Sequence, residues 1–144
     1  MKEFQKFFRE NLQSLHNEIN SFEHEEDLWE IKGTIKNPPA NIAMHMCGNL
    51  KHYIGHGIGN NGYIRNRDLE FSIKGLSKEQ ILNEINSTIE ALDAVFEKLT
   101  YDDLLKNYEH DYYGENKKIA FVLSILSQHL GYHLGQINYY RRLI

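Results

Sequence analysis

Two histidines near the C-terminal end of the chain are spaced so that they could bind one metal ion together. His129 and His133 lie four residues apart in residues 127–137, SQHLGYHLGQI, a stretch that is otherwise patterned as a helix. At about 100° per residue, this spacing brings both imidazoles to one face, one turn apart. Such a pair can hold an ion, or it can be two unrelated polar residues at a seam between helices. The choice depends on whether the chain supplies a third ligand.

A second helical pattern, between residues 39 and about 57, offers that ligand on a polar strip beside its apolar face. Asn49, His52 and His56 all fall within about 40° of His45 at the helical step. His45 has the most apolar neighbours and lies nearest the start of the helix, so it is our candidate for the third ligand. We expect His52 and His56 at the edge of a pocket or at the surface. Three imidazoles would leave open positions on the ion, whereas a structural zinc usually takes four protein ligands.

Three other side chains near these histidines have more than one interpretation. Asn49 could orient a ligand or bind a metal-bound water, or it could join two helices by a buried hydrogen bond. Gln136 lies close enough to His133 to support it, and helix packing is the equal alternative. Cys47 lies about 200° around the helix from His45, so we expect a small core residue rather than a nucleophile.

Four long helical patterns account for most of the chain, and no segment alternates convincingly as a strand. The connection over residues 57–77 is long enough to cross a bundle, and we expect residues 65–73 to lie extended across it. The third helix begins at Ser77-Lys78-Glu79-Gln80, which has the form of a capping box. The patterns cover residues 3–23, 39–57, 77–99 and 117–143. The sequence therefore predicts an all-α four-helix bundle with a long crossover between the second and third helices.

The connection also contains charged residues with two possible roles. Arg65 and Arg67 could face an anionic substrate, but we favour pairing with Asp68 or Glu70, which would pin the loop. A different turn-rich segment, residues 101–118, carries the aromatic pair Tyr112-Tyr113, which could fold back over one end of the bundle.

Composition limits the classes of protein that this chain could belong to. Its 144 residues suit one domain, residues 1–144, and its formal net charge of −4 argues against a nucleic-acid-binding protein. A single cysteine excludes an internal disulfide. No apolar run is long enough for a signal peptide or a membrane span. We therefore expect a soluble cytoplasmic protein with no membrane association.

Three motifs together resemble the DinB/YfiT-like superfamily, and in particular an uncharacterised branch of it. They are His45-Met-Cys-Gly-Asn49-Leu, the RNRDLEF loop at residues 65–71, and His129-Leu-Gly-Tyr-His133-Leu-Gly-Gln136-Ile. The resemblance covers roughly residues 39–143. It implies a four-helix bundle with a long crossover, frequent homodimers, and a divalent metal ion, commonly zinc or nickel. The metal-ligand positions carry over onto His45, His129 and His133.

The resemblance also implies a class of reaction. Characterised members of the superfamily include thiol S-transferases that use small thiols such as bacillithiol, and a mycothiol-dependent isomerase. We therefore expect a metal-dependent thiol transferase acting on small electrophiles, although the sequence assigns no catalytic residue. The alternative is a non-catalytic, stress-related bundle protein whose metal is structural or vestigial. It is motivated by the absence of an evident acid–base partner, such as a glutamate, beside the histidines.

Overall fold

Four long helices run along the long axis of the computed structural model, which describes residues 2–110 and 117–144. The prediction of an all-α bundle is confirmed, because the described residues form helices and contain no strand beyond an isolated bridge between Asn107 and Lys118. The long helices are α1 (Lys2–Asn20), α2 (Pro39–Leu50), α4 (Lys78–Phe96) and α6 (Ile119–Arg141). Short helical segments are η1 (Glu25–Leu28), η2 (Lys51–His56), α3 (Arg67–Ser72) and α5 (Tyr101–Leu104).

The apolar stripes predicted from the sequence face the centre of the bundle. On α1, the stripe at steps of three and four residues is buried, from Phe8 to Ile19. α1 packs against α4 and α6, and α2 packs against α4, α6 and α3. No helix of the described residues is long and apolar enough to cross a membrane. The predicted fold-back of Tyr112-Tyr113 lies outside the described residues.

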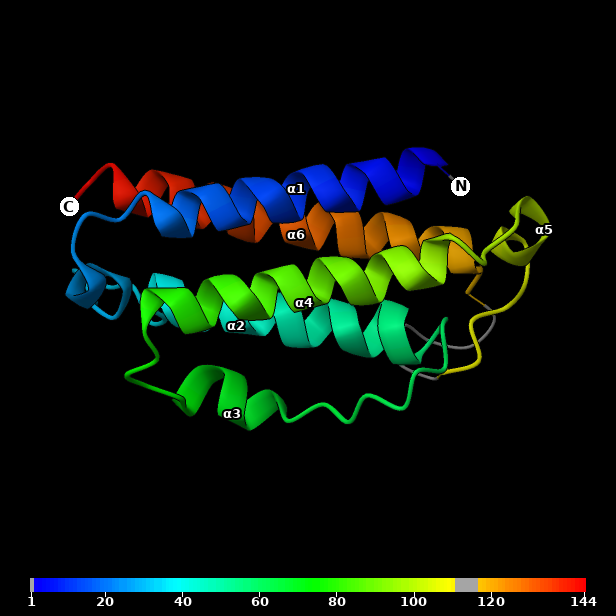
Figure 1. Ribbon diagram of the computed structural model, residues 1–144, viewed down its shortest axis with the longest axis horizontal. Helices are drawn as coiled ribbons and strands as arrows, with labels where there is room; N and C mark the ends of the chain where they lie inside the picture. The colour runs from blue at the N-terminus through cyan, green and yellow to red at the C-terminus, as the bar shows by residue number, and fades with distance from the viewer. Residues whose placement is uncertain (1, 111–116) are drawn as a thin grey trace.

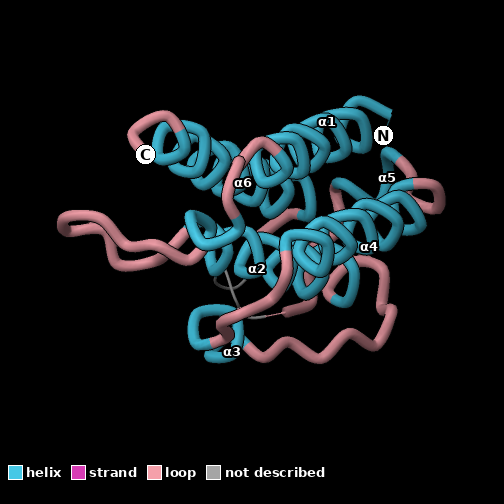
Figure 2. The backbone as a smooth tube through the Cα atoms, turned by 60° about the vertical axis from the view of Figure 1, so that its left-hand side comes forward, coloured by secondary structure: helices cyan, strands magenta, loops and turns pink. Residues whose placement is uncertain are grey.

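The crossover between α2 and α4 gives the bundle its topology. α1 and α6 run in one direction, and α2 and α4 run in the other, so α2 and α4 are parallel neighbours (Figure 1). A parallel pair cannot be joined by a short turn, and the connection travels back along the outside of α2 (Figure 2). The capping box that ends this connection is present, with Ser77 N donating to Gln80 Oε1 at 2.9 Å and Gln80 N donating to Ser77 Oγ at 3.2 Å.

The middle of the crossover differs from the extended run that the sequence predicted. Residues 67–72 form the short helix α3, and the Asn66 side chain caps it by accepting a hydrogen bond from Leu69 N at 3.1 Å. Buried Asn41 on α2 then fixes the helix in place, because its Nδ2 donates to the backbone oxygens of Glu70 and Ile73, both at 2.9 Å. The expectation of an extended run was therefore wrong, because the cap at Asn66 and the anchor on α2 stabilise a helix over these residues.

After Leu50, where α2 ends, the chain continues directly into the wider π-helical segment η2. In this segment Gly57 N donates to His52 O at 2.8 Å and Gly59 N donates to Ile54 O at 2.9 Å, each across five residues. The predicted helix over residues 39–57 thus exists as two consecutive segments, and its polar strip continues from one into the other.

Candidate metal centre

The structure brings the three predicted metal ligands together at the seam between α2 and α6. His45 comes from α2, and His129 and His133 lie one turn apart on α6. The Nε2 atoms of His45 and His129 are 3.2 Å apart, and one ring nitrogen from each histidine lies within 4.8 Å of the others. Within residues 2–110 and 117–144, no other group of three or more His, Cys, Asp or Glu residues meets this test.

The donor atoms of this cluster suit a divalent transition metal. Nitrogen ligands of zinc lie about 2.0–2.1 Å from the ion, which places them about 3.3 Å from one another in a tetrahedron. Burial, followed by the charges of His133, His45 and Arg65, lowers the pKa of His129 to about 4. Burial also lowers the pKa of His133 and outweighs the hydrogen bond that His133 donates to Gln136, which raises it. Both rings are therefore neutral near pH 7 and each offers a lone pair.

His45 is held from behind by Glu70, a residue that sequence reasoning left without a role at the site. Nδ1 of His45 lies 2.8 Å from Glu70 Oε2, and both residues are buried. An ionised carboxylate only accepts hydrogen bonds, so Nδ1 carries the proton and Nε2 keeps its lone pair, directed at His129. The expectation that no glutamate lies beside the histidines was wrong, because the crossover returns Glu70 to α2.

Arg65 holds Glu70 in turn, which confirms the predicted pairing for Arg65, whereas no ion pair of Arg67 is present among the described residues. Its Nε and Nη2 atoms donate to the two carboxylate oxygens at 2.7 and 2.8 Å. Arg65 Nη2 also lies 3.3 Å from His45 Nδ1, but a guanidinium has only donors and cannot bond to a protonated nitrogen. Burial raises the pKa of Glu70, yet the hydrogen bonds from Arg65 and His45 outweigh burial and keep the pKa below its usual value.

Gln136 plays the corresponding part for His133. Its Oε1 lies 2.7 Å from His133 Nδ1, and its Nε2 donates to the hydroxyl of Tyr132 at 3.0 Å. Because the amide oxygen accepts, Nδ1 of His133 carries the proton, and its Nε2 is left available to an ion. Of the two interpretations of Gln136, the structure favours support of His133.

The remaining candidates lie where the sequence placed them or nearby. Cys47 is buried in the core, and burial raises the pKa of its thiol to about 12, so it is no nucleophile. Arg67 lies over the ring of Phe71, 5.3 Å from its centroid.

Asn49 is buried, and its Oδ1 has no hydrogen-bond partner among the described residues. His52 and His56 are half-buried, at the far end of the polar strip.

Gly48 explains how the carboxylate of Glu70 comes so close to α2. A Cβ at Gly48 would lie 2.1 Å from Glu70 Oε1, a distance that no packed structure allows. The glycine three residues after His45 was therefore the signal in the sequence that another side chain packs against α2 there. Gly131, between the two histidines of α6, has no atom within 4 Å of such a Cβ.

We therefore expect opposite results from alanine at these two glycines. Gly48→Ala should displace Glu70 and lower the free energy of unfolding by about 1–3 kcal/mol, the usual cost of overpacking. Gly131→Ala should leave it unchanged or raise it by up to about 1 kcal/mol, because alanine suits an open helical site. Urea denaturation measures both. Equal stability of the two variants would contradict the close approach of Glu70 to Gly48.

Comparison with known proteins gives a family without an assigned activity. No curated protein matches the chain. A family model matches residues 1–144, the whole of the sequence, and its description is "Protein of unknown function (DUF1572)". The match spans both the helices and the loop that build the histidine cluster, and on this basis the chain belongs to the DUF1572 family.

Proposed function

We propose that this protein binds a divalent metal ion, zinc or nickel, through His45, His129 and His133, and that the ion activates a small-molecule nucleophile. The observation that carries the proposal is the convergence of three imidazoles, two of them held by Glu70 and Gln136 in the tautomer that directs Nε2 toward an ion. When bound, such an ion supplies Lewis acidity, which makes a thiol or water nucleophilic at neutral pH.

The residues around the ion would fix its histidine ligands and leave coordination positions open for a small molecule. Among the described residues three side chains offer a ligand atom to this site, so an ion would keep positions for a small molecule. The ion pair of Arg65 with Glu70 is buried and keeps His45 from turning. Glu70 is already committed to two partners, so we assign it a positioning role and not that of a general base.

The class of substrate rests on resemblance to the DinB/YfiT-like superfamily. Its thiol S-transferases support a low-molecular-weight thiol as the nucleophile and a small electrophile as its target. A cavity of about 460 Å³, which none of the three histidines lines, is our candidate for the position of a small, largely apolar second substrate. Ile42, one turn before His45, and Gln136, the partner of His133, are among its lining residues. A homodimer in the cytoplasm is the assembly and location that resemblance and composition favour.

Metal content is the first test of the proposal. Untagged protein should contain close to one equivalent of zinc or nickel, measured by elemental analysis after dialysis. His129→Ala should remove this metal, because two imidazoles hold an ion much less tightly than three. His24→Ala is the matched control, since His24 is exposed beside η1 and should not matter. Metal-free wild type together with unchanged uptake by His129→Ala would end the proposal.

The buried carboxylate gives a second test. Glu70→Gln keeps the shape of the side chain but offers one acceptor oxygen in place of two, so His45 loses its fixed orientation. We expect metal affinity to fall by about 10–100-fold, as is usual for loss of a ligand's outer partner. Competition with a chromogenic chelator measures it. Asp68→Asn, an exposed change on the same helix, should leave the affinity unaltered.

Activity separates the transferase from the non-catalytic alternative. Bacillithiol, mycothiol and glutathione are each offered with a panel of small electrophiles, and loss of free thiol is followed. We expect turnover with at least one thiol, in proportion to the zinc or nickel content of the preparation. A fully metal-loaded protein that turns over none of these pairs would leave the structural-metal alternative standing.

A further inference from the structure

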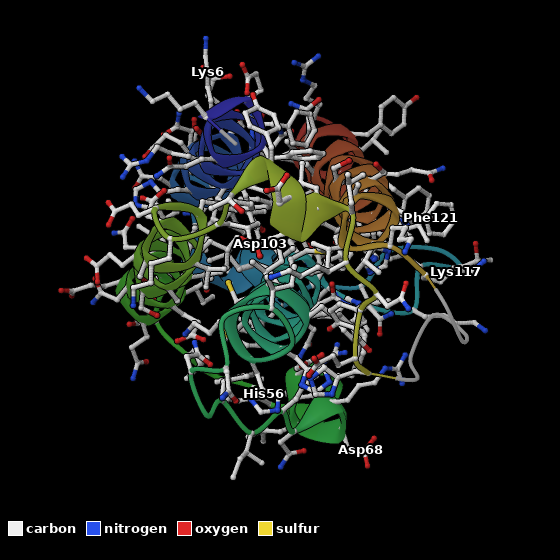
Figure 3. All side chains as sticks on the ribbon, turned by 90° about the vertical axis from the view of Figure 1, so that its right-hand side faces the viewer. Lys6, His56, Asp68, Asp103, Lys117 and Phe121 are labelled. Carbon is white, nitrogen blue, oxygen red and sulfur yellow. The ribbon has the colours of Figure 1, made fainter. Side chains whose placement is uncertain are left out.

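A second group of histidines lies outside the candidate metal centre, and its member His56 is labelled in Figure 3 at the end of the bundle that faces the viewer. His52 and His56 belong to η2, and His110 follows the short helix α5 by a few residues. The ring centroids of His52 and His56 are 6.1 Å apart, and those of His56 and His110 are 5.4 Å apart. Thus three of the eight histidines gather at a place that the proposed function does not use.

The two histidines of η2 in this group carry ring nitrogens that have no partner in the part of the chain that the structure describes. Nδ1 of His52 and Nδ1 of His56 are both shielded from solvent and lack a hydrogen-bond partner among the described residues. A buried polar atom without a partner costs about 1–3 kcal/mol. Two such atoms on neighbouring rings point to a ligand that satisfies imidazoles.

The chemical character of the group favours a cation of the transition series. Burial, followed by the charges of Arg65, His56 and His110, lowers the pKa of His52, so this ring is neutral at pH 7. Neutral imidazoles suit zinc, nickel and copper, whereas calcium and magnesium prefer oxygen ligands. Arg65, whose charge contributes to this lowering, forms an ion pair with Glu70.

We propose that His52, His56 and His110 form a second metal site for zinc, nickel or copper, separate from the one on His45, His129 and His133. Like the first cluster, it combines two histidines four residues apart on one helical segment with a third from another segment, but its ring nitrogens do not yet lie within 4.8 Å of one another. It does not depend on the proposed function, because it shares no ligand with the first site.

The second site should be the weaker of the two, for two structural reasons. In the first cluster the ring centroids lie 4.5–5.4 Å apart and the nitrogens already converge. In the second the rings of His52 and His56 are nearly parallel, with 22° between their planes, so side chains must rotate to share an ion. His110 is also exposed and loses conformational freedom on binding.

The experiment is a calorimetric titration of the untagged full chain, stripped of metal, with Ni²⁺ or Zn²⁺ alone. Wild type should show two classes of site. The double variant His52→Ala with His56→Ala should lose the weak class only, and His129→Ala with His133→Ala should lose the tight class only. His16→Ala is the control, because His16 has a buried unpartnered Nδ1 like the others but lies on α1, which supplies no ligand to either cluster.

The double variant could lose the weak class because η2 misfolds, so His110→Ala is a second variant that avoids this problem. His110 is exposed, and the circular dichroism of His110→Ala should match that of wild type. This variant should weaken the second class by about tenfold or more, at least the cost of losing an outer partner. A single class of site in wild type, or a weak class that persists in both the double variant and His110→Ala, would overturn the proposal. If wild type lacks the tight class but shows the weak one, the proposed function is contradicted and the second site is supported.

Discussion

The buried carboxylate of Glu70 is the interaction on which the candidate metal centre depends. Removing a carboxylate from water costs several kcal/mol, so the group stays ionised only where it is fully paired. Arg65 supplies two charge-assisted hydrogen bonds and His45 supplies a third. Each partner is thereby fixed by the same group, and the imidazole of His45 is oriented before any ion arrives.

This constraint links the site to the topology of the bundle. Because α2 and α4 are parallel, the chain must return along the outside of α2, and that return places α3 against the helix that carries His45. Asn41 fixes the backbone of α3, and Gly48 leaves the space that the Glu70 side chain fills. The crossover is therefore part of the site and not only a connection.

The two histidine clusters show what such outer partners contribute. In the first, Glu70 and Gln136 accept from the Nδ1 atoms of His45 and His133, and the ring nitrogens converge. In the second, the Nδ1 atoms of His52 and His56 have no partner among the described residues, and their rings stand farther apart. The hydrogen bonds to Glu70 and Gln136 thus orient two ligands of the first cluster, and no such partner of His52 or His56 Nδ1 is found among the described residues.

The sequence by itself determined the features that depend on local spacing. Steps of three and four residues predict the four long helices and the capping box at Ser77. The same steps place His129 and His133 on one helical face. The choice of His45 as the third ligand also came from its helix, through its apolar neighbours, and the structure places it with the other two.

Only the tertiary structure decided how those ligands are held. Glu70 lies 25 residues from His45 along the chain, and no local period relates them. Its position depends on the cap at Asn66, which turned an apparent extended run into α3, and on the anchor that Asn41 provides from α2. Spacing along a helix fixes which side chains share a face, whereas contact between distant segments is set by packing and hydrogen bonds that form only when the bundle closes.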